Sequence, residues 1–258
     1  MASRSARVYR TCLPVLLLAA ATACKSTEPA APAAPDRPAA AAVQRRVVLE
    51  TDTVRVSQIG LGPGADTGLH THASAHLAVA LTDGVLINVL PDGSSRGNSI
   101  NEGDMTFVPA GVTHTLRNGY SLPFRGVTID LLQPQHGLLN ACATMDPNQS
   151  DDCWGQEGNP QEGILFLRLQ TDHANVSRLT LAPGNEFTIS GRAVPTLVVA
   201  LAGTEAIALP EPRIPAGSSG KGKMPLQAGD AVTGLADSPL TVRNTGSRPA
   251  RFIVVEFH

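Results

Sequence analysis

Residues 70–76 read His-Thr-His-Ala-Ser-Ala-His, and a fourth histidine follows at position 114. Imidazole nitrogen is a good ligand for zinc, copper, iron and nickel, so this group of histidines indicates a site for a divalent transition metal. His70, His72 and His76 share sequence parity, and side chains of equal parity point to the same face of an extended strand. An unbroken strand would aim all three at one ion, although the small residues between the second and third histidine are a natural place for a break.

Two spaced motifs surround these histidines. The first runs from a glycine through the histidine pair to a third histidine and a closing glycine, at Gly64, His70, His72, His76 and Gly84. The second has its fixed positions at Gly103, Pro109, Gly111, His114 and Asn118. This arrangement resembles the two cupin motifs, G-x5-H-x-H-x3,4-E-x6-G and G-x5-P-x-G-x2-H-x3-N. The chain departs from them at His76, where the family has glutamate, and at Gly84, which comes one residue late.

The resemblance implies a jelly-roll β-barrel over residues 47–135, with one divalent metal held inside its mouth. Its ligands would be His70, His72 and His114, together with His76 in the place of the glutamate. Four-histidine and three-histidine sites both occur in the wider family, so His76 is either a ligand or turned aside. Loss of the carboxylate argues against manganese and leaves iron, nickel, copper or zinc.

Local patterns agree with an all-β fold. Short apolar segments are separated by glycine and proline turns, and no helical pattern lies between them. The segments that predict strands in the first half are 53–57, 77–81, 85–89 and 105–108. Those in the second half are 197–201, 206–209 and 252–255.

Residues 163–258 contain a degraded copy of the same motifs. The first motif recurs with its ligands replaced, at Gly184, Ser190, Arg192, Thr196 and Gly203. The second keeps only its first glycine and final asparagine, at Gly229, Leu235, Asp237, Leu240 and Asn244. We therefore predict two tandem cupin-type barrels, the second without metal and with Ser190, Arg192 and Thr196 filling the former metal cavity. A generic β-sandwich is the alternative.

The N-terminal residues predict export. Three arginines precede a short apolar core in residues 1–23, which is the pattern of a signal peptide. Ala21-Thr22-Ala23-Cys24 resembles a bacterial lipobox, which implies a diacylated Cys24 anchored in a membrane. Residues 24–46 then form an alanine- and proline-rich tether. The expected location is the bacterial cell envelope, facing the periplasm, with the outer membrane favoured; a secreted or periplasmic protein is the alternative.

Besides the lipidated Cys24, two cysteines remain in the predicted mature chain, both in the predicted connector 136–162. Cys142 and Cys153 would form a disulfide in an oxidising compartment. On the chain-entropy model, closing a loop of this length stabilises the folded state by about 3 kcal/mol. Their spacing is not that of a C-x-x-C redox or metal pair.

Charge limits the partners. The net charge of −2, without a basic block in the folded part, argues against nucleic acid as a partner. A small-molecule ligand or substrate fits a barrel interior, and the chain would be a monomer or a homodimer. Two functions remain open. One is a metal-dependent enzyme, an oxygenase or an isomerase or lyase acting on a small oxygen-rich molecule. The other is a non-catalytic module that binds a metal or small ligand.

Overall fold

The computed structural model describes residues 43–135, 163, 166–190, 195–201, 203–209, 224–234, 237 and 239–258. These residues form eighteen β-strands and no helix, so none of them belongs to a helix that could cross a membrane. The predicted signal peptide, Cys24, nearly all of the tether, both cysteines of the proposed disulfide and Arg192 lie outside the described residues.

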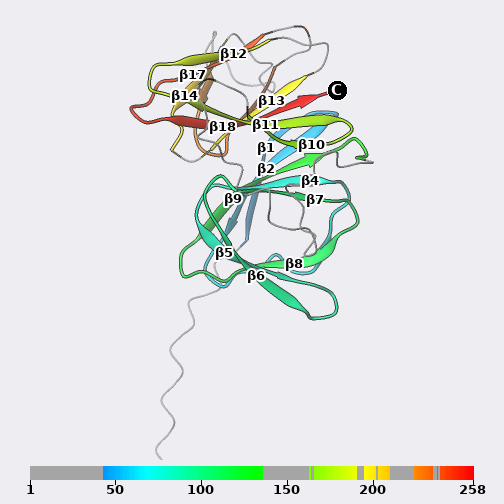
Figure 1. The fold of residues 1–258 in the computed structure, drawn as a ribbon. Coiled ribbons are helices and arrows are strands. Elements are labelled where there is room, and N and C mark those ends of the chain that lie inside the picture. Colours follow the sequence, from blue (N-terminus) through cyan, green and yellow to red (C-terminus); the bar gives the residue numbers. More distant parts are fainter. Residues whose placement is uncertain are drawn as a thin grey trace, which may run out of the picture. The chain divides into compact units, whose positions relative to one another are not determined.

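The first barrel is built from two antiparallel sheets that lie opposite each other (Figure 1). Its five-stranded sheet has the order β1 (Gln44–Glu50), β2 (Val54–Leu61), β9 (Phe124–Leu131), β4 (His76–Ala80) and β7 (Met105–Val108). Its four-stranded sheet has the order β3 (His70–Thr71), β8 (Thr113–Asn118), β5 (Gly84–Val89) and β6 (Ser95–Ile100).

The second barrel repeats this arrangement strand for strand. Its five-stranded sheet has the order β10 (Phe166–Gln170), β11 (Ala174–Leu181), β18 (Ala250–Phe257), β13 (Thr196–Ala200) and β16 (Ala231–Gly234). Its four-stranded sheet has the order β12 (Glu186–Ile189), β17 (Leu240–Asn244), β14 (Ala206–Leu209) and β15 (Met224–Leu226). The prediction of an all-β chain with two tandem jelly-roll barrels is confirmed.

One hydrophobic core joins the two five-stranded sheets. On β4, Leu77 and Val79 belong to this core, and the second barrel contributes residues such as Val255 on β18. Because side chains alternate across a strand, the residues between them point the other way. Ala80 accordingly packs with Phe124 in a separate cluster inside the first barrel. The sequence parity of each strand thus decides which side chains face the other barrel and which face the barrel interior.

The final asparagine of each second motif has the same structural task. Asn118 donates from its side-chain amide to the carbonyl oxygens of Leu61 and Leu122, at 3.0 and 2.9 Å. Asn244 donates in the same way to Leu181 and Arg248, at 2.9 and 2.7 Å. Both asparagines are almost wholly buried. The second copy has therefore retained Asn244, whose side chain links two backbone segments by hydrogen bonds.

The turn before each metal-ligand position also persists. Gly111 has a φ of 82°, a left-handed conformation that a β-carbon strains. Asp237 stands at the corresponding position of the second copy and has a φ of 61°. Aspartate tolerates this region better than most residues, so the turn is retained without its glycine.

Removing a side chain from the shared core should destabilise the whole protein. Leu77 is fully buried there, and we expect Leu77→Ala to lower the free energy of unfolding by about 2–5 kcal/mol. Leu122, whose exposed fraction is 59%, provides the matched control, and Leu122→Ala should change it by less than about 0.5 kcal/mol. Urea denaturation followed by circular dichroism measures both. Equal effects from the two variants would contradict this account of the core.

Candidate metal centre

Three of the four histidines lie on strands of the two facing sheets. His70 lies on β3 and is the register partner of His114 on β8, whereas His76 begins β4 in the opposite sheet. His72 lies between β3 and β4, and its backbone N–H donates to the carbonyl of Val112 at 3.0 Å. Sequence parity predicts that His70, His72 and His76 share one face of an extended run. In the structure the chain leaves β3 after residue 71 and crosses to the other sheet, so the histidines converge from both walls.

The imidazole rings form one cluster. The nearest nitrogens of His70, His72 and His114 lie within 4.8 Å of one another, a group that can hold a metal ion. The Nε2 atoms of His72 and His114 are 2.9 Å apart. The fourth ring, that of His76, lies against His72 with a centroid separation of 4.1 Å. The structure therefore brings together all four predicted residues, with three of them forming the convergent nitrogen group.

Hydrogen bonds orient two of the rings. His70 donates from Nδ1 to the carbonyl oxygen of Gly68 at 2.9 Å. His114 donates from Nδ1 to Oδ1 of Asn88 at 2.7 Å. A proton held on Nδ1 leaves the lone pair on Nε2, which is how histidine ligands are commonly fixed by a second partner. Asn88, on β5, is a supporting residue that the motifs did not identify.

Burial keeps His72, His76 and His114 neutral. Desolvation lowers the pKa of His72 and His114 to about 4 and that of His76 to about 3, from an ordinary value of 6.5. Neighbouring imidazoles lower these pKa values further, since charging one ring disfavours charging the next. A neutral imidazole is the form that binds metal, so these rings are in the ligating state at neutral pH.

The donor set fits a transition metal. Two ligands at right angles around an ion, each at about 2.0–2.1 Å, are about 2.9 Å apart, which matches the separation of the His72 and His114 nitrogens. Nδ1 of His76 is buried and has no hydrogen-bond partner among the described residues. All ligands of the convergent group are imidazoles, the type that suits zinc, copper, iron and nickel.

Apolar side chains occupy the second-barrel positions equivalent to His70 and His114. Ile189 pairs with Leu240 in the register that His70 and His114 have in the first barrel, and both are buried in an apolar cluster. The prediction that Ser190 fills the former cavity is wrong. Ser190 follows the end of β12 and is exposed, because the register places Ile189 in the interior instead. Thr196 is buried, at the position equivalent to His76.

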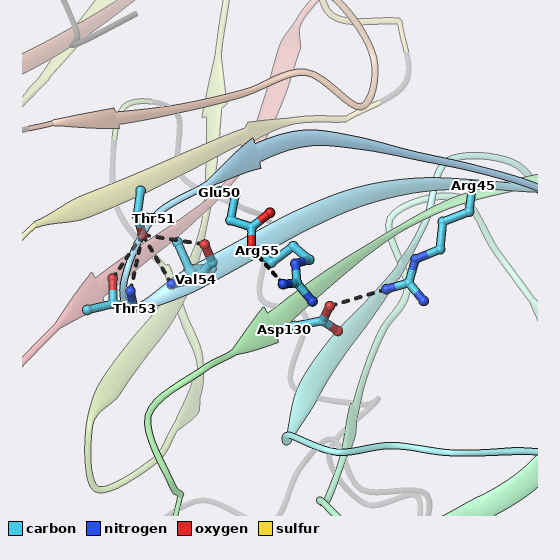
Figure 2. A network of polar contacts seen from close by, with 7 residues as sticks. All are labelled: Arg45, Glu50, Thr51, Thr53, Val54, Arg55 and Asp130. Atoms are coloured by element: carbon cyan, nitrogen blue, oxygen red, sulfur yellow. Dashed lines mark hydrogen bonds and ion pairs between the residues drawn. The ribbon is translucent and has the colours of Figure 1, made fainter. Parts of the chain in front are cut away.

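Two charged residues near the site were missed by the sequence analysis. Asp130 on β9 is the register partner of His76, and its carboxylate accepts a hydrogen bond from Arg45 on β1 at 3.2 Å (Figure 2). Burial raises the pKa of the Asp130 carboxyl above its usual value, against the opposing effect of the nearby arginines. The alternation of side chains along the strand could have identified Asp130. Asp130 lies between the buried Ile129 and Leu131, so its side chain points to the opposite face of β9, which is the barrel interior.

Known proteins resemble the chain in sequence and in fold. No model of a known protein family matches it. The beta-alanine degradation protein BauB of Pseudomonas aeruginosa is 36% identical over 72 residues, which are 28% of this chain and 75% of BauB. The structure of AerE from Microcystis aeruginosa has a TM-score of 0.60 and 14% identity, over 84% of this chain and 92% of AerE. Bacillus subtilis oxalate decarboxylase, a protein with Mn(II) centres, has a TM-score of 0.54 and 16% identity, over 83% of this chain and 72% of that one.

Fold, motifs and relatives agree on the class of protein. It is a tandem jelly-roll protein whose first barrel holds a histidine cluster that can bind a metal. The chain belongs to the same family as BauB, and its two tandem barrels have the cupin fold in the bicupin arrangement.

The low pKa values predict how the metal-free protein responds to acid. Below about pH 6.5 the unfolded chain protonates these imidazoles, while the folded protein keeps them neutral until about pH 4 for His72 and His114 and about pH 3 for His76. The unfolded state then binds more protons, so stability should fall as pH drops from 6.5 towards 4. Urea denaturation of chelator-treated protein across this range measures the slope.

Replacing one of these groups should reduce that slope. His76→Gln removes one buried imidazole, and its loss of stability between pH 6.5 and 4 should be shallower than that of the unmutated protein. Identical slopes in the two proteins would contradict the assignment of the acid response to this cluster.

Proposed function

We propose that the first barrel binds one divalent transition metal through His70, His72, His76 and His114, and that the protein is a metal-dependent enzyme. The reaction would be that of an oxygenase, or of an isomerase or lyase, on a small oxygen-rich molecule. The observation that carries this proposal is the contrast between the barrels. One interior holds converging imidazoles, while the other holds Ile189 and Leu240 in the same register.

The ligand set suggests what the site would favour. A bound ion would act as a Lewis acid towards an anionic or chelating oxygen ligand. Four neutral imidazoles leave the full charge of a divalent ion in place, whereas a glutamate ligand would reduce it by one. Oxalate decarboxylase has Mn(II) centres, but manganese prefers oxygen ligands and this cluster offers nitrogen. We therefore favour iron, nickel, copper or zinc.

The residues around the cluster would maintain it. Gly68 and Asn88 accept the Nδ1 protons of His70 and His114, so both rings keep their orientation and their Nε2 lone pairs. Ala78 and Leu116 contribute a small and an apolar side chain to the rest of the lining. Substrate specificity would then depend on the metal and on the few charged groups beside it.

Metal content tests the site directly. The mature protein purified without chelators should carry about one transition-metal ion per chain, measured by elemental analysis. His72→Ala should abolish binding, because it removes a central member of the convergent group. His258→Ala, which changes an exposed histidine far along the sequence, should keep the full content. Metal-free unmutated protein would refute the proposal.

Activity needs its own measurement. Oxygen uptake and product analysis with flavonols, diketones and uronates would distinguish an oxygenase from an isomerase or lyase. A metal-loaded protein without activity on any of them would favour the non-catalytic module. The described residues support that alternative in one respect, since the convergent metal group contains no carboxylate that could act as a base.

We also propose that the protein is anchored in the bacterial cell envelope through a lipid on Cys24, facing the periplasm. The support is the sequence Ala21-Thr22-Ala23-Cys24 after an apolar segment, and the alanine- and proline-rich residues that follow. A disulfide between Cys142 and Cys153 would suit the same oxidising compartment.

The anchor can be tested in cells. The unmutated protein should incorporate radiolabelled palmitate and sediment with membranes, whereas Cys24→Ala should lose both properties. Cys12→Ala, in the predicted signal peptide, is the matched control and should retain them. A soluble, unlabelled parent protein would instead indicate ordinary signal cleavage and a periplasmic or secreted protein.

A further inference from the structure

An arginine reaches across the inner face of the five-stranded sheet. Arg45 lies on β1, and its guanidinium donates to Asp130 on β9, although β2 separates these two strands (Figure 2). Its register partner on β2 is Ile59, whose side chain packs in the cluster inside the barrel. The side chain of Arg45 therefore runs over the inner face towards β9 and not along the outer face.

This direction brings the guanidinium towards the histidines. Asp130 is directly opposite His76 in the β4–β9 pair, and directly opposite residues share a face of the sheet. The guanidinium of Arg45 thus lies on the side of the sheet that carries His76, although Arg45 comes from a distant part of the sequence.

Arg45 and the neighbouring Arg55 differ in the burial of the carboxylates that they pair with. Arg55 is paired with Glu50 at 2.6 Å, and both side chains are substantially exposed (Figure 2). The Asp130 side chain is only 13% exposed, while that of Arg45 is 54% exposed. A guanidinium has five N–H donors, and the hydrogen bond to Asp130 uses one of them. Asp130 holds the guanidinium in place while much of it still meets solvent.

We infer that Arg45 is an anion-binding residue of the first barrel. Its guanidinium would donate to a carboxylate of a small organic acid bound to the metal ion at the histidine cluster. The inference rests on the proposed function and names its substrate class. A cluster without a carboxylate ligand keeps the full charge of its ion, and an adjacent guanidinium adds another positive charge. Guanidinium and carboxylate match in geometry as well as charge. Neutral oxygen compounds would gain nothing from Arg45.

Malonate is a suitable probe, since one carboxylate can meet the metal and the other the guanidinium. Isothermal titration calorimetry on the metal-loaded protein should show malonate binding that Arg45→Met weakens about 10-fold or more. Arg45→Lys keeps the positive charge but not the paired N–H donors, so its malonate affinity should lie between those of the unmutated protein and Arg45→Met. Malonamide, the neutral analogue, should bind no more tightly to the parent than to Arg45→Met.

The adjacent arginine provides the matched control. Arg46 points to the opposite face of β1, where it donates to Gln58 at 3.0 Å, so Arg46→Met should leave malonate affinity unchanged. Metal content is measured on each variant before titration. A parent protein without metal would overturn the proposed function and this inference together. A metal-loaded parent that fails to bind malonate, or binds it equally well as Arg45→Met, would overturn the inference alone.

Discussion

The packing of the two five-stranded sheets against each other determines the rest of this structure. Alternate residues of β4 and β9, including Leu77 and Ile129, are fully buried in the core that joins the barrels. Side chains alternate between the two faces of a strand, so the side chains of the adjacent residues His76 and Asp130 point into the first barrel. A one-residue slip of either strand would put the site residues into the hydrophobic core and the core residues into the site.

The site also depends on where the chain changes sheets. His70 is held in the four-stranded sheet by its pairing with His114, whereas His76 is held in the five-stranded sheet by β7 and β9. The four residues that separate β3 from β4 cross the barrel, and His72 lies at the start of that crossing. A short segment can therefore supply ligands from opposite walls, which a single strand could not do.

Much of this was predictable from sequence, and the exceptions have physical causes. Turn glycines and Asn118 occupy the motif positions because backbone geometry demands them, and Asn244 shows the same hydrogen bonds in the second barrel. Strand β6 was not predicted, since its exposed residues 95–99 lack an apolar alternation. Arg45 was missed because only the pairing of β1, β2 and β9 brings it near the histidines. These are long-range consequences of register, and no local pattern carries them.

The second barrel shows that the fold does not need the histidines. It has the same strand order, and its interior is an apolar cluster that includes Ile189 and Leu240. In the first barrel the same register positions hold His70 and His114. Buried polar atoms without a hydrogen-bond partner among the described residues occur in both barrels, for example on His76 in the first and on Asn175 in the second. Each such group costs about 1–3 kcal/mol, a penalty that an apolar interior avoids. The fold therefore does not require the histidines, which agrees with the proposal that they bind a metal.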